Sequence, residues 1–141
     1  MESDYPLIVK QHVRPIILVV EDVEETRDVI ALLLESDGYR VDPARNEDDA
    51  VRCARSERPG LILVSLAGSE ATVIATAKRI RQRAELGEAI PVIIFCTVSL
   101  DEGAELGIGR NVYVTRPDNF DQLRAFLKRL IALFPVVPPI N

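Results

Sequence analysis

The sequence has no tryptophan, one histidine, one methionine and two cysteines among its 141 residues. Cys53 and Cys96 are too far apart in sequence to indicate a disulfide framework or a metal-binding cluster, so we expect two reduced thiols. His12 lies near the N-terminus, which leaves no suitably placed histidine to activate a nucleophile. These shortages argue against a disulfide-stabilised secreted domain, a cysteine-based metal site and a histidine-dependent hydrolase.

The chain also lacks a long apolar run and an excess of positive charge. No stretch approaches the roughly 20 apolar residues of a membrane span, and "MESDYPLIVKQHVRP" lacks the basic start and apolar region of a secretory signal. With 17 Lys and Arg against 22 Asp and Glu, the net charge is −5. This balance argues against nonspecific binding to nucleic acid or an anionic membrane. We therefore expect a cytoplasmic protein that binds neither.

Short apolar runs alternate along the chain with longer amphipathic stretches. The apolar runs predict strands at 16–20, 39–43, 61–64, 91–96 and 111–115. The amphipathic stretches predict helices at 23–36, 46–57, 70–85 and 119–134, with Asn46 and Ser69 as N-caps of the second and third. Segment 100–109 is predicted to be a poor helix at best, because each interior glycine costs up to about 1 kcal/mol relative to alanine.

Alternating strands and helices indicate an α/β fold with a parallel sheet covered on both faces. The runs at 16–20, 61–64 and 92–95 are apolar throughout and belong at the sheet centre, whereas 39–43 contains a proline and belongs at an edge. The pattern matches a flavodoxin-like doubly wound (βα)5 fold, with a five-stranded parallel sheet of order 2-1-3-4-5. We expect one domain over 15–134, with 1–14 as an N-terminal extension and 135–141 as a C-terminal tail.

In such a fold the carboxyl ends of the strands line one crevice. Polar and thiol side chains follow four of the predicted strands: Glu21, Asp22, Ser65, Cys96, Thr97 and Arg116. Each alone has an ordinary explanation as a helix start, a loop residue or a surface charge. Together they predict a functional crevice.

The chain resembles the receiver domain of two-component response regulators from about Pro15 to Phe134. The stretches that carry the resemblance are "ILVVEDVEETR", "GYRVDPARNEDDA", "RPGLILVSLAG", "IPVIIFCT" and "VYVTRPDNFDQL". In receivers an aspartate at the end of the third strand accepts a phosphoryl group from a histidine kinase, and Ser65 stands there. The acidic pair that holds Mg²⁺ is matched by Glu21 and Asp22.

The resemblance also assigns positions near the fourth and fifth strands. Cys96, with Thr97 next to it, stands where receivers have a hydroxyl that bonds the phosphoryl group. Arg116 replaces the lysine that pairs with the phosphoryl group, and its bond to the following proline is expected to be cis. Tyr113 matches the aromatic residue that reports activation.

These replacements predict that the phosphotransfer chemistry has been lost. Ser65 offers a neutral hydroxyl, which is a weak nucleophile without an adjacent base and does not replace a carboxylate ligand for Mg²⁺. We expect Arg116 to bridge toward Glu21 or Asp22 instead, because arginine pairs bidentately with carboxylates. Magnesium binding is then expected to be weak or absent, with no catalytic residue, no metal ligand and no cofactor.

The resulting hypothesis is a pseudo-receiver, a non-enzymatic signalling module of a two-component phosphorelay that binds a protein partner without aspartyl phosphorylation. By resemblance, the partner would bind the face made by segment 100–109, the strand with Tyr113 and helix 119–134. The opposite rim of that helix presents a basic stripe of Arg124, Lys128 and Arg129, which is either an ordinary solvated face or a surface that steers an acidic partner. We expect a monomer or weak homodimer.

Three alternatives remain open at the level of sequence. Another phosphorylation, such as that of Ser65 by a serine kinase, could regulate the domain. The altered crevice could bind a small ligand. A serine hydrolase is disfavoured, because "LVSLA" is not the G-x-S-x-G nucleophile motif.

Overall fold

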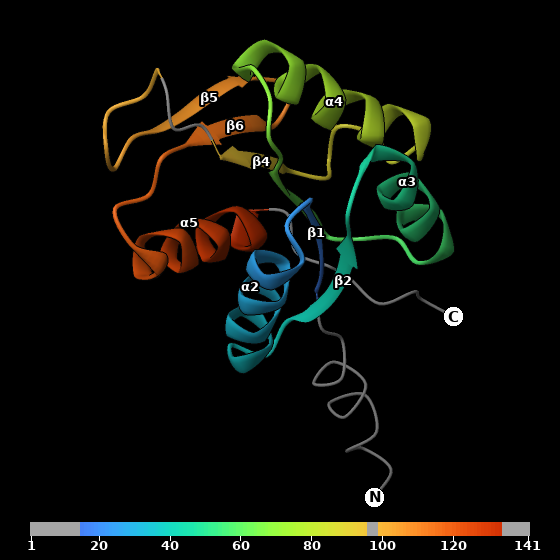
Figure 1. Ribbon diagram of the computed structural model, residues 1–141, viewed down its shortest axis with the longest axis horizontal. Helices are drawn as coiled ribbons and strands as arrows, with labels where there is room; N and C mark the ends of the chain where they lie inside the picture. Colours follow the sequence, from blue (N-terminus) through green and yellow to red (C-terminus); the bar gives the residue numbers. More distant parts are fainter. Residues whose placement is uncertain (1–14, 96–98, 134–141) are drawn as a thin grey trace, which may run out of the picture.

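The computed structural model describes residues 15–95 and 99–133, which form a six-stranded sheet flanked by four helices (Figure 1). The strands are β1 (Ile16–Glu21), β2 (Arg40–Ala44), β3 (Leu61–Ser65), β4 (Val92–Phe95), β5 (Glu105–Gly109) and β6 (Val112–Thr115). The helices are α2 (Glu24–Ser36), α3 (Glu47–Ser56), α4 (Glu70–Arg83) and α5 (Phe120–Leu133). The strand order is β2-β1-β3-β4-β6-β5. The predicted order is therefore confirmed for its five parallel strands.

The sheet separates two hydrophobic cores because successive residues of a strand face opposite sides. Leu18 and Val20 of β1 pack with α3 and α4, whereas Ile17 and Val19 pack with α2 and α5. Figure 1 shows the two helix pairs on opposite sides of the sheet. Strands β1, β3 and β4 lie in the interior, as their apolar sequences predict.

Two helices begin at the predicted N-caps. The Asn46 side chain accepts a hydrogen bond from the Asp49 N–H at 2.9 Å, and the Ser69 hydroxyl accepts one from the Thr72 N–H at 3.2 Å. Each bond satisfies an amide that has no partner within the first helical turn. The capping residues therefore fix where α3 and α4 start relative to β2 and β3.

The prediction of a poor helix at 100–109 is wrong, because this segment forms β5 and pairs antiparallel with β6. The two strands are joined by Arg110 and Asn111, both with positive φ (56° and 63°), which is the backbone of a tight two-residue hairpin turn. The expected five-stranded sheet therefore gains a sixth strand, and β6 lies inside the sheet instead of at its edge.

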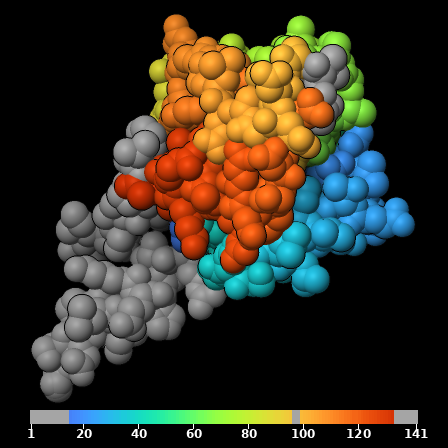
Figure 2. Space-filling model, turned by 90° about the vertical axis from the view of Figure 1, so that its left-hand side faces the viewer, coloured from blue at the N-terminus to red at the C-terminus, as the bar shows by residue number. Residues whose placement is uncertain are grey.

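The hairpin changes the surface on which the partner prediction rests. No helix stands between β4 and β6 in the described part of the chain, and β5 forms the edge of the sheet instead. Figure 2 shows the hairpin, in yellow to orange, lying against α5, in orange to red. The face expected to contain a helix is therefore made of β5, β6 and α5.

Candidate functional site

Glu21 and Ser65 lie side by side at the carboxyl edge of the sheet. They are direct register partners at the ends of β1 and β3. Glu21 is buried, Ser65 is half-buried and Asp22 is exposed. The structure thus brings together three of the predicted crevice residues.

The carboxylate of Glu21 helps to start α2. Its Oε2 accepts a hydrogen bond from the Val23 N–H at 3.0 Å, and its backbone carbonyl accepts one from the Arg27 guanidinium at 2.8 Å. Val23 is the N-cap of α2 and makes no side-chain capping bond of its own. Glu21 therefore supplies a capping carboxylate at the positive end of the helix.

Arg116 does not pair with the acidic residues as predicted. Its guanidinium donates a hydrogen bond to the Leu100 carbonyl at 3.0 Å, and no ion pair joins it to Glu21 or Asp22. The reason lies in its backbone, because the Arg116 N–H donates to the Ala104 carbonyl at 3.0 Å. This bond extends the hairpin pairing by one residue and turns the side chain toward the segment that leads into β5.

The expected cis bond between Arg116 and Pro117 is also absent, because no peptide bond among the described residues is cis. The Arg116 carbonyl accepts a hydrogen bond from the Gly103 N–H at 2.6 Å. Arg116 is therefore held on both its amide and its carbonyl as an extended residue, the conformation that a following proline favours.

Tyr113 lies between the sheet and α5. Its hydroxyl donates to the Asn111 side-chain oxygen at 2.8 Å, and its ring meets Phe126 edge-on with 5.7 Å between centroids. It is half-buried against the core shared with α2 and α5. Cys96 and Thr97, predicted to complete the crevice, lie outside the described residues.

A polar cluster that the sequence did not reveal joins the hairpin to α5. The Thr115 hydroxyl donates to the Ala104 carbonyl at 2.9 Å, and Gln122 of α5 donates to the Gly103 carbonyl at 2.7 Å. Thr115 is buried. The only sequence signal was a threonine that ends an apolar strand, which does not reveal a partner eleven residues earlier.

The basic stripe predicted on α5 is largely neutralised within the chain. Arg124 forms a bidentate pair with Asp37 at 2.7 and 2.6 Å, and the Asp37 side chain is only 8% exposed. Arg129 pairs with Glu105 of β5. These two arginines therefore stabilise contacts between α5 and its neighbours, which is a role that the sequence did not predict for them.

Magnesium is the metal that the family resemblance implies for this edge. The residues offered here are two carboxylates, one of them engaged in capping α2, and a serine hydroxyl. Within 15–95 and 99–133, no group of three or more His, Cys, Asp or Glu residues could hold a metal ion. Mg²⁺ usually keeps several waters and is held by one or two carboxylates. Glu21 and Asp22 are the residues here that could contact it, and Ser65 adds only a neutral hydroxyl.

No helix in the described ranges is long and apolar enough to cross a membrane.

Comparison with known proteins places residues 17–128 under the family model of the response regulator receiver domain. An uncharacterised 14.6 kDa protein from the sodA1 3′ region of Leptolyngbya boryana is 31% identical over 121 residues, which cover 84% of this chain and 92% of that protein. The transcriptional regulatory protein DltR of Streptococcus agalactiae is 30% identical over 114 residues, covering 79% of this chain and 50% of DltR. The chain thus spans about half the length of that curated regulator.

Solved structures show the same fold. The receiver domain of a signal transduction histidine kinase from Syntrophus aciditrophicus is 25% identical, with a TM-score of 0.65 over 90% of this chain and 97% of that one. The receiver domain of the sensor histidine kinase PA1611 from Pseudomonas aeruginosa is 29% identical, with a TM-score of 0.64 over 85% and 99%. The latter structure has a magnesium ion coordinated in its active-site cleft.

Proposed function

The chain belongs to the response regulator receiver domain family, and from this premise we propose that it transmits signals by binding a protein partner without accepting a phosphoryl group on an aspartate. The observation that carries the proposal is Ser65 at the carboxyl end of β3, in register with Glu21. This is the position at which the family resemblance requires an aspartate.

The chemistry of Ser65 supports the loss of phosphotransfer. An aspartate is ionised at neutral pH and attacks phosphorus as a carboxylate, whereas a serine hydroxyl needs a base to remove its proton. The chain's only histidine is His12, which precedes β1 in the sequence. Glu21, the carboxylate across from Ser65, is engaged with the Val23 amide.

The position of Arg116 supports the proposal independently. In the family resemblance the corresponding lysine pairs with the phosphoryl group. Here the guanidinium donates to the Leu100 carbonyl and is held there by the hairpin backbone. A phosphoryl group on Ser65 would therefore have to draw Arg116 away from an existing hydrogen bond.

We propose the face formed by the β5 edge of the sheet as the surface for the signalling partner. Leu106 of β5 has 51% of its surface exposed and pairs with Val114, so its side chain lies on the side of the sheet opposite α5. Strand β5 is the edge of the sheet, and edge strands present backbone groups that a partner can bind. A partner strand or helix could cover both features. The ion pair between Glu105 and Arg129 holds β5 against α5 and keeps this surface in one arrangement.

A matched pair of variants tests this surface. Leu106→Glu places a charge on the proposed face, and Val29→Glu places one on α2, where the native side chain is 56% exposed. We expect Leu106→Glu, but not Val29→Glu, to abolish recovery of a signalling protein that co-purifies with the tagged native chain. If only Val29→Glu abolishes recovery of that protein, the partner binds α2 and not the proposed surface.

Beryllofluoride binding tests the proposal at the crevice. With Mg²⁺ it mimics a phosphoryl group bonded to a carboxylate, and the response regulator TrrA of Thermotoga maritima has been crystallised with Mg²⁺-BeF. We expect no saturable change in the amide NMR signals of Glu21, Asp22 and Ser65 when Mg²⁺ and beryllofluoride are added together. A saturable change in the native chain would contradict the proposal.

The Ser65→Asp variant is the matched control. It restores the acceptor carboxylate but keeps Arg116 turned toward Leu100, so we expect a weak response at most. If only this variant binds beryllofluoride, the lack of binding by the native chain is due to Ser65. If neither binds it, Arg116 and the rest of the crevice also prevent binding.

A further inference from the structure

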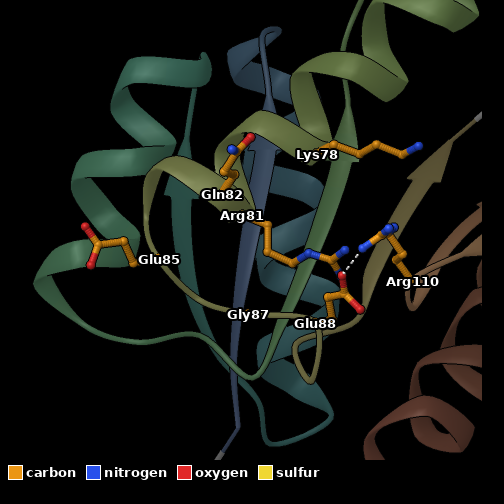
Figure 3. Close-up of a pocket in the computed structure, with 7 residues that line it drawn as sticks. All are labelled: Lys78, Arg81, Gln82, Glu85, Gly87, Glu88 and Arg110. Carbon is orange, nitrogen blue, oxygen red and sulfur yellow. Dashed lines mark hydrogen bonds and ion pairs between the residues drawn. The ribbon is translucent and has the colours of Figure 1, made fainter.

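A hollow of about 440 Å³ lies at the opposite end of the sheet from Ser65 (Figure 3). Its walls are α4, the loop that precedes β4, and the β5–β6 turn. Its volume falls within the range of small-molecule sites in proteins. No part of it overlaps the crevice discussed above, so it calls for a separate explanation.

Arg81 supplies a buried cation with unused hydrogen-bond donors. The residue is only 7% exposed, and its guanidinium makes one hydrogen bond within the described residues, from Nη1 to the Ile90 carbonyl at 3.0 Å. No buried side-chain nitrogen or oxygen in the described ranges lacks a partner. The remaining donors of Arg81 therefore reach solvent, and the surface that they reach lines the hollow.

Burial makes this charge costly when nothing pairs with it. It lowers the pKa of Arg81, an effect that nearby Glu88 opposes and nearby Arg110 reinforces. A largely buried guanidinium whose remaining donors face a hollow attracts an anion, and it binds phosphate or carboxylate in a bidentate manner.

Two further cations line the same hollow. Figure 3 shows Arg81 and Arg110 extending toward one another, with the Glu88 carboxylate between them. Arg110 pairs with Glu88 at 2.6 Å, while Lys78, one helical turn before Arg81, makes no hydrogen bond or ion pair with the described residues. Glu85 also lines the hollow but points away from this cluster. Glu88 therefore occupies the place that an external anion would take.

We propose that this hollow binds a small phosphorylated molecule. Its phosphate would bind Arg81, Arg110 and Lys78, with Glu88 displaced from Arg110. The remaining space would hold an uncharged, hydroxyl-bearing part beside Gln82, whose side-chain amide can form hydrogen bonds with hydroxyl groups. The proposal does not depend on how Ser65 behaves.

Calorimetric titration of the full chain tests the site with three probes: inorganic phosphate, glucose 6-phosphate and glucose. We expect saturable binding of both phosphates, tighter for glucose 6-phosphate, and none of glucose. Saturable binding of inorganic phosphate alone would assign the hollow to the free ion and overturn the proposal. Absence of saturable binding by either phosphate would overturn it as well.

Two variants with opposite expected effects locate the binding. Arg110→Gln should weaken glucose 6-phosphate binding about tenfold, because it removes a charge-assisted hydrogen bond. Glu88→Gln should strengthen it about threefold, because it removes a carboxylate that competes for the same cations. Unchanged or weaker binding by Glu88→Gln would contradict the proposed position of the phosphate.

Arg40→Gln is the matched control for Arg110→Gln. Arg40 is also an exposed arginine in a single ion pair, with Glu57 at 2.9 Å, and it lies on β2, outside the hollow. We expect this variant to bind glucose 6-phosphate like the native chain. Equal weakening by both variants would show a general effect of net charge and would overturn the site.

Discussion

At the scale of single residues, the chain keeps two carboxylates and one cation at the positions of a receiver crevice but uses them differently. Glu21 is occupied with the start of α2, and Arg116 is occupied with the Leu100 carbonyl. Among the described carboxyl groups, the one whose pKa is shifted furthest is Glu47 of α3, outside this crevice. Arg79 binds both Glu47 oxygens, at 2.8 and 3.0 Å, and Arg83 binds one of them at 2.9 Å.

This cluster predicts a pH-dependent contribution to stability. The hydrogen bond from Arg79, with help from Arg83, lowers the pKa of Glu47 from 4.5 to about 2. Because the folded pKa is below the unfolded one, the stabilisation is present above pH 4.5 and disappears as the pH falls toward 2. Glu47→Gln should therefore lower the free energy of unfolding by about 1–2 kcal/mol at pH 7, after allowing for the exposed arginines.

Urea unfolding of the native chain and Glu47→Gln across this pH range measures the effect. The difference in unfolding free energy should narrow steadily below pH 4.5. Glu57→Gln, which breaks the exposed pair with Arg40, should have a much smaller effect at neutral pH. A difference for Glu47→Gln that stays constant between pH 7 and pH 3 would contradict this account.

At the scale of secondary-structure elements, the β5–β6 hairpin is the main departure from the expected fold. The backbone of Gly103 leads into it with a φ of +86°, and its amide and carbonyl bond Arg116 and Gln122. A Cβ added at Gly103 would lie 3.1 Å from an Asp118 side-chain oxygen. This glycine is therefore favoured by its backbone conformation, and an added Cβ would also require the Asp118 side chain to shift by a few tenths of an ångström.

The Gly103→Ala variant should lower the free energy of unfolding by about 2 kcal/mol, since it adds crowding to backbone strain. Gly38→Ala is its control, because Gly38 also has a positive φ, +95°, but nothing lies within 4 Å of an added Cβ. The control should lose only about 1 kcal/mol. Urea unfolding gives both values, and equal losses would mean that the contact with Asp118 carries no cost.

Sequence patterns predicted most strands and helices correctly, but they did not predict the β5–β6 hairpin. The three fully apolar runs place β1, β3 and β4 inside the sheet, and Asn46 and Ser69 fix two helix starts through local hydrogen bonds. Segment 100–109 has too few apolar residues to reveal its period, and the resemblance to the family favoured a helix. The missed signal was Arg110-Asn111 between two short runs, a turn whose positive φ values allow a hairpin.

The candidate site was predictable in position but not in contacts. Strand ends meet at one edge of a parallel sheet, so Glu21 and Ser65 were expected to be neighbours, and they are. The partner of Arg116 depends on β5, which the sequence did not reveal. The carboxylate partner of Arg124, Asp37, is 87 residues away in sequence, and no local pattern links them.

At the scale of the whole molecule, the described chain is a receiver frame with two separate sets of polar groups at opposite ends of its sheet. The carboxyl end presents Ser65 with Glu21 and Asp22, and the amino end presents the cations around Arg81. The bidentate pair between Arg124 and Asp37 joins α5 to the end of α2, which helps to hold the helices of one face together. We infer that the receiver fold of this chain serves to bind other molecules.

The most direct test of this account is the intact mass of the native chain after incubation with Mg²⁺ and a small phosphodonor such as acetyl phosphate. A receiver whose third strand ends in aspartate, treated in parallel, provides the positive control. Because Ser65 is a neutral hydroxyl and the neighbouring Glu21 carboxylate is bonded to the Val23 amide, the mass of the native chain should remain unchanged while the control gains a phosphoryl group. A native chain that gains one phosphoryl group under these conditions would contradict the central claim.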